Sequence, residues 1–311
     1  MANFLDKILG RKRTTAPLSP SEIDTAPLQT DENKVDTAEL EGRGDKKPSA
    51  RRLDLPQFIT GCGHSSGLQR DHNEDALFTL TTNLIADETQ IPFGLYIIAD
   101  GMGGHLHGEI ASGVAARALA VEVIRKIFLS YLGMSDAHSE ESVQEILQEG
   151  VQHAHREILS IAQGGGTTLT AALIMGDKLT ITHVGDSRAY LIYPDGSREI
   201  LTQDHSLVRR LEELGQITSS EAANHPQRNV LYRALGQGEP FEPDIATITF
   251  PRSAHLLICS DGLWGVVPDT EISRIVNSTR NPEMACQMLA DAANNAGGPD
   301  NITMILVRLP D

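Results

Sequence analysis

The chain alternates between short apolar runs rich in β-branched residues and longer stretches in which apolar residues recur with helical spacing. The short runs have the length and composition of strands, and the longer stretches have the periodicity of amphipathic helices. Strands are predicted at residues 77–85, 93–99, 169–174, 178–184, 188–193, 245–250, 255–259 and 302–307. Helices are predicted at residues 109–132, 142–161 and, near the end of the chain, 282–293.

The order of these elements favours one fold class. The strands come in consecutive groups, with helices in the middle of the chain and near its end, and they do not alternate singly with helices. Turns such as Pro194-Asp195-Gly196 between predicted strands suit antiparallel hairpins. We therefore expect an α+β fold built on antiparallel sheets, beginning near Phe58.

Composition and charge narrow the functional classes. An apolar content of 40% in 311 residues is enough for a substantial core. The formal net charge of −16 argues against nucleic-acid binding, because phosphate backbones are held by clustered Lys and Arg, and it suits cation binding. Cys62, Cys259 and Cys286 are too far apart for a disulfide framework or a thiolate metal site, which favours a reducing cytoplasm. No apolar run has the length of a membrane span, and no signal peptide is visible.

Residues 1–55 are predicted to form a disordered tail, because they are poor in aromatic residues and rich in Thr, Pro, Asp, Glu and Lys. The start of the tail differs, since Phe4, Leu5, Ile8 and Leu9 fall on one helical face. The positive charges around and after this face are Lys7, Arg11, Lys12 and Arg13. This segment either docks weakly on a membrane surface or a partner, or is a frayed terminus with chance spacing. The protein is accordingly expected in the cytoplasm, with peripheral attachment to the inner membrane face as the alternative.

Acidic residues recur beside Gly or Asn at the edges of the predicted strands. In LYIIADGMGGHLH, residues 95–107, an apolar strand ends at Asp100 and Gly101, a glycine turn follows, and a helix begins. Alone, an Asp-Gly pair after a strand is more often only a turn. The same arrangement is found, however, in four other stretches, at residues 70–75, 184–188, 256–262 and 298–301.

Strand ends at one edge of a pair of sheets can converge. Several carboxylates brought together repel each other unless divalent cations neutralise them. A set of oxygen ligands suits Mg²⁺ or Mn²⁺ and does not suit zinc. No His-x-x-x-His or Cys-x-x-Cys motif competes for this role. The sequence therefore predicts a magnesium or manganese centre.

Seven segments together make the chain resemble the metal-dependent protein serine/threonine phosphatases of type 2C, in their bacterial form. The segments follow that family's order across residues 58–307 and are RDHNEDA, ADGMGGHLHGE, GGGTTLTAAL, VGDSRAYL, LTQDHSLV, CSDGLW and GPDNIT. The resemblance implies a four-layer sandwich, in which two antiparallel β-sheets are flanked by helix pairs and the metal centre lies at one end. It also implies a catalytic domain at residues 56–311.

The resemblance implies metal ligands position by position. Asp100 matches the carboxylate that bridges two tightly bound Mn²⁺ or Mg²⁺ ions. Glu74 and Asp75 match positions that act largely through metal-bound water, and Asp186 matches a ligand of a third, weaker ion that it shares with Asp261. The full set of implied ligands is Glu74, Asp75, Asp100, the Gly101 carbonyl, Asp186, Asp261 and Asp300.

Two further residues are expected to act in catalysis. Arg70 matches the phosphate-binding arginine of the family, and a guanidinium can grip two phosphate oxygens at once where a lysine cannot. The alternative is a surface arginine paired with Glu74. The leaving alkoxide needs a proton, and Met102 stands where eukaryotic members have a histidine. His105 therefore either supplies this proton or has a structural role.

The resemblance implies an enzyme that hydrolyses phosphoserine and phosphothreonine in phosphorylated proteins and opposes a bacterial serine/threonine kinase. Two divalent ions would activate a shared water and screen the charge of the phosphate. The alternatives are a catalytically weak regulator with the phosphatase fold and a phospho-dependent docking scaffold. We expect a monomer.

Three features beside these motifs receive other interpretations. Thr167 and Thr168 follow three glycines and resemble a phosphate cradle, but a strand follows directly, so a glycine turn is the preferred interpretation. Trp264, the only tryptophan, is expected to pack in the core. Residues 204–229 are polar and partly helical, and they resemble the mobile flap of the family, where substrate selection is expected.

Overall fold

The computed structural model describes residues 58–86, 89–103, 106–132, 141–238 and 241–309. These residues belong to one compact unit, Asp54–Asp311. The tail predicted at residues 1–55, including its amphipathic start, and His105 lie outside the described residues. None of the described helices is both long enough and apolar enough to cross a membrane.

Two antiparallel sheets of five strands each form the centre of this unit. One sheet has the order β1-β12-β11-β8-β9, with bounds Ile59–Ser65, Ile302–Arg308, His255–Cys259, Arg188–Ile192 and Arg198–Ile200. The other has the order β10-β7-β6-β3-β2, with bounds Asp244–Thr249, Lys178–Val184, Leu169–Met175, Thr89–Ala99 and Ala76–Ala86. A small third sheet pairs β4 (Gly101–Met102) with β5 (Gly166–Thr167).

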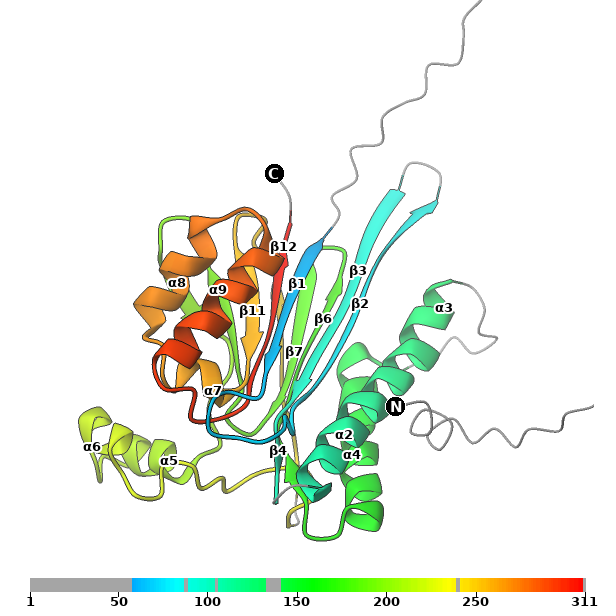
Figure 1. Ribbon diagram of the computed structural model, residues 1–311. Coiled ribbons are helices and arrows are strands. Elements are labelled where there is room, and N and C mark those ends of the chain that lie inside the picture. The colour runs from blue at the N-terminus through cyan, green and yellow to red at the C-terminus, as the bar shows by residue number, and fades with distance from the viewer. Residues whose placement is uncertain (1–57, 87–88, 104–105, 133–140, 239–240, 310–311) are drawn as a thin grey trace, which may run out of the picture. The chain divides into compact units, whose positions relative to one another are not determined.

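Helices cover the outer face of each large sheet (Figure 1). The sheet containing β3 carries α2 (Leu106–Val123), which continues through a π-helical turn (Ile124–Phe128) into α3 (Leu129–Tyr131), together with α4 (Val143–Ile161). The sheet containing β12 carries α8 (Asp269–Ser278) and α9 (Pro282–Asn295). The remaining short helices are α5 (Leu207–Glu213), α6 (Ser219–Ala223) and α7 (Asp261–Trp264).

Three apolar clusters hold these layers together. One lies between the α2–α4 pair and its sheet, where Leu119, Val151 and Ile97 are fully buried. Another fills the space between the two sheets and includes Tyr96 and Ile258. The third lies between the other sheet and the α8–α9 pair. The order helices, sheet, sheet, helices is the predicted four-layer α+β sandwich.

The ends of the long helices follow from local sequence. Ser142 caps α4, since its hydroxyl accepts from the Glu145 N–H while the Glu145 side chain accepts from the Ser142 N–H. This reciprocal pair satisfies two donors that a helix start leaves open. Asn281 caps α9 in a similar way, and Pro282 follows as its first residue, where no N–H is needed. Both helix starts lie within a residue of the predicted positions.

The predicted strands are all present, but some elements were missed. The expectation contained no strand at β1 or β9 and no helix at α8. The three residues of β9 are exposed, and β1 contains Gly61 and Gly63 and only one buried residue, so neither carries a clear apolar pattern. The single helix predicted at residues 109–132 begins earlier, at Leu106, and is interrupted by the π-helical turn.

The topology brings five strand ends to one edge. Ala99, the last residue of β3, pairs with Ala76, the first residue of β2. In the other sheet Cys259, the last residue of β11, pairs with Arg188 at the start of β8 and with Met304 near the start of β12. All of the acidic junctions predicted from sequence therefore meet at the same end of the sandwich.

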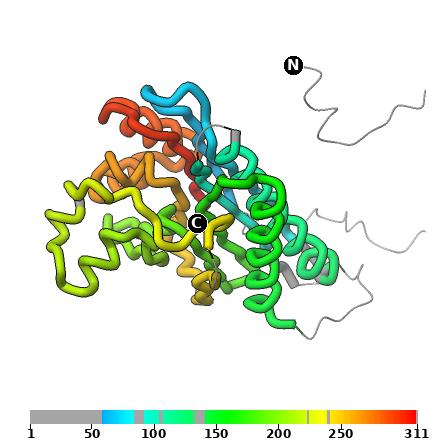
Figure 2. Tube along the Cα trace, turned by 90° about the horizontal axis from the view of Figure 1, so that it is seen from below, coloured from blue at the N-terminus to red at the C-terminus, as the bar shows by residue number. Residues whose placement is uncertain are grey.

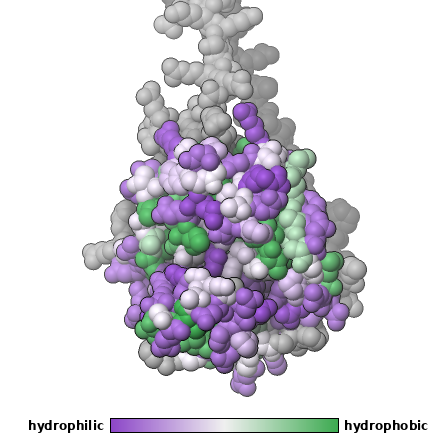
Figure 3. All heavy atoms as spheres, turned by 90° about the vertical axis from the view of Figure 1, so that its left-hand side faces the viewer, coloured by the Kyte–Doolittle hydropathy of each residue, from purple (hydrophilic) through white to green (hydrophobic). Residues whose placement is uncertain are grey.

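Two surface features complete the unit. The segment with α5 and α6 projects from the end that carries the acidic junctions, close to α7 in Figure 1, and stands out from the body in yellow-green in Figure 2. The face covered by α8 and α9 is mainly hydrophilic, with apolar side chains scattered between polar ones (Figure 3).

Candidate metal centre and active site

A cleft of about 330 Å³ opens where the strand ends meet. Acidic side chains dominate its lining, and Arg70 is the one basic side chain among the described residues that line it. The expected site residues in the lining are Arg70, Glu74, Asp100, Gly101, Asp186, Asp261 and Asp300. Asp75 lies buried beside them, with 7% of its surface exposed. The structure thus brings together every predicted site residue that it describes.

The backbone of Asp100 is fixed by two threonines. Its N–H donates to Thr168 Oγ1 at 2.9 Å, and its carbonyl accepts from the Thr168 N–H at 2.9 Å and from Thr167 Oγ1 at 2.8 Å. Sequence reasoning had assigned both threonines to a glycine turn outside the site. Their side chains instead hold the residue at the centre of the cleft, across 67 and 68 positions of sequence.

Gly101 allows two backbone segments to approach closely. A Cβ atom at this position would lie 2.4 Å from the carbonyl oxygen of Gly108 and 2.5 Å from that of Glu74. No side chain fits at such distances, so only glycine is compatible with this packing. The close packing places the Gly101 backbone in the lining of the cleft beside Asp100.

Asn301 ties together the loops that carry the acidic residues. Its side-chain oxygen accepts from the Glu74 N–H at 2.8 Å. Its amide group donates to the carbonyls of Ser66 and His72 at 3.1 and 2.9 Å. The residue next to Asp300 therefore fixes the loop of Glu74, a role that the sequence did not reveal although Asn301 belongs to one of the acidic junctions.

The carboxyl groups are crowded around Asp100. The carboxyl groups of Asp75 and Asp261 each lie within hydrogen-bonding reach of the Asp100 carboxyl group. Such a hydrogen bond needs a proton on one of the two groups, and it is lost when both are ionised. Ser260 donates to one oxygen of Asp75 at 3.1 Å, whereas the other oxygen, Oδ1, is buried without a hydrogen-bond partner. This arrangement is costly for the anions unless a positive charge is added.

Burial and mutual repulsion raise the pKa values of these acids. Burial first, and neighbouring carboxylates second, raise the pKa of Asp261 to about 7. Burial also raises the pKa of Asp75 to about 6, and the hydroxyl groups around it oppose the rise only in part. The pKa values of Asp100 and Asp186 lie well above the ordinary value of 3.8 for the same two reasons, burial and nearby carboxylates. The protein alone therefore does not compensate the charge of this cluster.

The donor set fits a divalent cation. The cleft offers carboxylate and carbonyl oxygens, and neither Cys nor His is among its described lining residues, which suits Mg²⁺ or Mn²⁺. The unpartnered oxygen of Asp75 adds an acceptor. Within the described ranges, no three His, Cys, Asp or Glu side chains are placed so that they could hold an ion as they stand. Among these acids, Asp300 is instead paired with Arg70.

Arg70 and Glu74 each have a partner at the mouth of the cleft. Arg70 Nη2 donates to Asp300 Oδ2 at 2.9 Å, and its side chain is 53% exposed. Glu74 Oε1 lies 3.3 Å from Nε2 of His72. The alternative considered from sequence, an ion pair between Arg70 and Glu74, is therefore not the pairing in this structure. An exposed guanidinium beside the acidic cluster is accessible to an incoming phosphate.

The family model described as protein phosphatase 2C matches residues 61–302. The chain belongs to the protein phosphatase 2C family. Among its relatives, the serine/threonine phosphatase stp of Listeria innocua is 38% identical over 254 residues, which cover 78% of this chain and 92% of the relative. The protein phosphatase PhpP of Streptococcus pneumoniae is 37% identical over 69% of this chain and 85% of the relative.

Solved structures agree with this family assignment. The serine/threonine phosphatase PstP/Ppp of Mycobacterium tuberculosis has a TM-score of 0.67 and 30% identity, over 82% of this chain and all of that chain. The catalytic domain of PstP in complex with two manganese ions has a TM-score of 0.65, 30% identity and nearly the same coverage. The predicted family, the α+β sandwich, the phosphoprotein phosphatase activity and the dependence on Mn²⁺ or Mg²⁺ are confirmed.

Proposed function

We propose that the cleft around Asp100 is the place where this phosphatase of the 2C family hydrolyses phosphoserine and phosphothreonine in proteins. Asp100, the Gly101 carbonyl, Asp261 and Asp300 would hold two Mn²⁺ or Mg²⁺ ions. When bound, such ions supply an activated water and screen the charge of the phosphate. The observation that best supports this assignment is the convergence of acidic groups from five strand ends in one cleft. Burial and neighbouring carboxylates raise the pKa values of four of these acids, Asp75, Asp100, Asp186 and Asp261.

Two further acids would act around the ions. Asp75 presents a buried Oδ1 without a donor, which suits a hydrogen bond from a coordinated water. Glu74 lines the cleft, and its backbone is fixed by Asn301. Asp186 would hold a third, weaker ion together with Asp261, since both residues line the cleft and the negative charge of Asp261 contributes to the raised pKa of Asp186.

Arg70 is proposed to bind the phosphate. Its guanidinium carries several donors in a planar fork, and the bond to Asp300 uses one of its nitrogens, Nη2. The remaining donors can grip two equatorial phosphate oxygens, which orients the phosphorus for attack in line with the leaving oxygen. Asp300 would in turn keep the guanidinium at the mouth of the cleft.

The departing alkoxide needs a proton, and its source remains a proposal from sequence. Met102 lines the cleft, but a thioether cannot transfer a proton. His105, three residues farther along and outside the described residues, would be the general acid, with a structural role as the alternative.

The substrates, the opposing enzyme and the cellular location are also proposals. The bacterial relatives are named serine/threonine phosphatases, which supports phosphorylated proteins as substrates and suggests a serine/threonine kinase as the opposing enzyme. We propose that the chain is a cytoplasmic monomer whose basic and apolar start, residues 4–13, docks weakly on an anionic membrane or an acidic partner. The tail at residues 1–55 would then act as a linker to the catalytic domain at residues 56–311.

One assay tests this function against its alternatives. Hydrolysis of a phosphothreonine peptide and of p-nitrophenyl phosphate is measured with Mn²⁺, with Mg²⁺ and with EDTA, in the wild type and in Asp100→Asn. We expect turnover with either metal, none with EDTA and nearly none in the variant. Tight peptide binding without turnover in the presence of Mn²⁺ would instead favour the docking scaffold or the weak regulator.

A further inference from the structure

The turn that carries Asp186 is held on several sides. Gly185, Asp186 and Ser187 connect β7 to β8, and the Gly185 N–H donates to Nδ1 of His205 at 3.1 Å while the Gly185 carbonyl accepts from the His205 N–H at 2.7 Å. The Ser187 hydroxyl hydrogen-bonds Thr168 Oγ1 at 2.8 Å. The turn is therefore fixed by hydrogen bonds to neighbouring loops.

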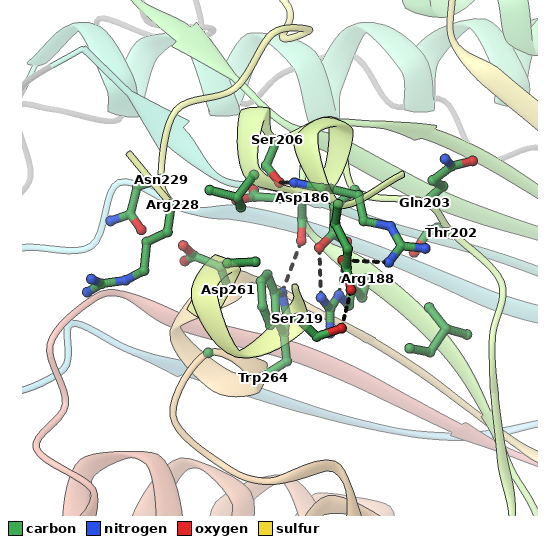
Figure 4. A pocket seen from close by; sticks show the side chains of 17 residues that line it. Asp186, Arg188, Thr202, Gln203, Ser206, Ser219, Arg228, Asn229, Asp261 and Trp264 are labelled. Atoms are coloured by element: carbon green, nitrogen blue, oxygen red, sulfur yellow. Dashed lines mark hydrogen bonds and ion pairs between the residues drawn. The ribbon is translucent and has the colours of Figure 1, made fainter. Parts of the chain in front are cut away.

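Asp186 itself is held by Trp264. The indole Nε1–H donates to the Asp186 carbonyl at 3.0 Å, the bond drawn between these two residues in Figure 4. Trp264 closes the short helix α7 that begins at Asp261, three residues earlier. One hydrogen bond consequently connects the helix that carries Asp261 to the turn that carries Asp186.

The indole ring is fixed in turn. The guanidinium carbon of Arg188 lies 3.5 Å from the centre of the Trp264 ring. Arg188 forms two parallel hydrogen bonds to the carboxylate of Asp204, at 2.9 and 2.7 Å. Because the side chains of Arg188 and Asp204 are only 19% and 9% exposed, this ion pair is rigid and keeps the ring from tilting. The direction of the indole N–H is thereby set.

A second cavity, of about 740 Å³, adjoins the metal cleft at this point. Trp264, Asp186 and Asp261 all line it, together with residues of α5 and α6, and Asp186 and Asp261 also line the metal cleft. Figure 4 shows Asp186 and Asp261 on either side of the indole edge. A phenyl ring at position 264 could also stack on Arg188, so packing by itself does not explain why an N–H group lies at this edge.

We propose that Trp264 is a positioning residue, whose indole N–H sets the separation of Asp186 and Asp261 and thereby the affinity of the third ion. This inference rests on the proposed function, in which these two acids share that ion. Without the N–H, α7 loses its hydrogen bond to the Asp186 carbonyl, while the bonds of Gly185 and Ser187 keep the turn in place. The separation of the Asp186 and Asp261 carboxylates is then less well defined. The weakest metal site suffers, whereas the ligands Asp100 and Asp300 are untouched.

Three variants of the full-length protein test the proposal. Trp264→Phe keeps the aromatic stack and removes only the donor. Val267→Ala is the matched control, because Val267 is buried in the apolar cluster against which Trp264 packs, and its side chain has no donor for the Asp186 carbonyl. Asp186→Ala removes the proposed ligand. Mn²⁺ is titrated into each metal-free protein by calorimetry, and thermal midpoints are measured in EDTA.

We expect Trp264→Phe to raise the Kd of the weakest Mn²⁺ site about threefold to tenfold, the range expected for the loss of one hydrogen bond, while the tight sites keep their affinity. Val267→Ala should lower the thermal midpoint without this change in Kd. Asp186→Ala should lose the weakest site. In the wild type, the fluorescence of Trp264, the only tryptophan, should change over the Mn²⁺ range that fills the weakest site.

The outcomes separate this inference from the proposed function. If Trp264→Phe binds Mn²⁺ as the wild type does, or if Val267→Ala weakens the site equally, Trp264 only packs and the inference is overturned. If Asp186→Ala keeps the weakest site, the third-ion assignment fails and takes the inference with it. If no variant and no wild type binds Mn²⁺, the proposed metal centre itself is wrong.

Discussion

Replacing Asp75 by Asn should stabilise the metal-free protein, little at pH 4 and fully above about pH 6. Asp75 is buried beside other carboxylates, and its pKa rises from the ordinary 3.8 to about 6. A carboxyl group whose pKa is raised in the folded state holds its proton more tightly there than in the unfolded chain. It therefore destabilises the fold as pH increases from about 4 to about 6, and the cost is complete above that range.

The size of the effect follows from the two pKa values. Each unit of difference between the folded and unfolded pKa values corresponds to about 1.36 kcal/mol. The ionised Asp75 therefore lowers the unfolding free energy by about 3 kcal/mol at pH 8 and by about 0.5 kcal/mol at pH 4, and the substitution removes this cost. For a domain of this size, about 3 kcal/mol corresponds to a rise of roughly 6 to 12 °C in thermal midpoint.

Thermal unfolding in EDTA at pH 8 and pH 4, followed by circular dichroism, measures this directly. Asp177→Asn is the matched control, because Asp177 lies exposed in the turn between β6 and β7 and its replacement changes the net charge equally. We expect Asp75→Asn to melt higher than the wild type at pH 8 and close to it at pH 4, with no such difference for the control. Added Mn²⁺ should stabilise the wild type more than the variant. An Asp75→Asn protein that melts lower than the wild type at pH 8 would refute the reasoning.

Three other variants address single features of the site. Arg70→Ala should raise KM for p-nitrophenyl phosphate about tenfold or more with a smaller effect on kcat, because charged hydrogen bonds to the phosphate are lost. Arg117→Ala, which removes an exposed arginine on α2, is the control, and an unchanged KM with a collapsed kcat would point to another role for Arg70. Thr168→Val should lower kcat at saturating Mn²⁺ by roughly tenfold or more, since the Asp100 N–H loses its acceptor, and normal turnover would show that Asp100 does not need this bond. Gly185→Ala should lower the unfolding free energy by about 1–3 kcal/mol, because Gly185 has a φ of +106° and an added Cβ atom would lie 2.6 Å from the Cβ atom of Thr168. A thermal midpoint equal to that of the wild type would contradict this expected strain.

The acidic residues of the site could be found from sequence because their position is a local property. Each one stands where an apolar strand ends or begins beside Gly or Asn, so the pattern of the strand and the residue type occur together. Antiparallel pairing then places such ends at one edge, as the pairing of Ala76 with Ala99 illustrates. The resemblance to a known family supplied the roles of the individual residues.

The residues that hold these acids could not be found in the same way. Thr168 meets Asp100 across 68 positions, Asn301 meets Glu74 across 227, and Trp264 meets Asp186 across 78. Whether a threonine or a tryptophan donates to such a distant backbone depends on sheet register and side-chain direction, which leave no periodic pattern in the chain. The interpretation of Trp264 as core packing was incomplete for this reason.

In the proposed site, carboxylates from several strand ends jointly hold the catalytic ions around Asp100. The most direct test is a calorimetric titration of Mn²⁺ into the metal-free wild type and into Asp100→Asn, with circular dichroism to verify that both are folded. The account predicts at least two tightly bound ions in the wild type and the loss of both in the variant, because Asp100 lies between the other ligands. Two tightly bound ions in a folded Asp100→Asn protein would contradict it.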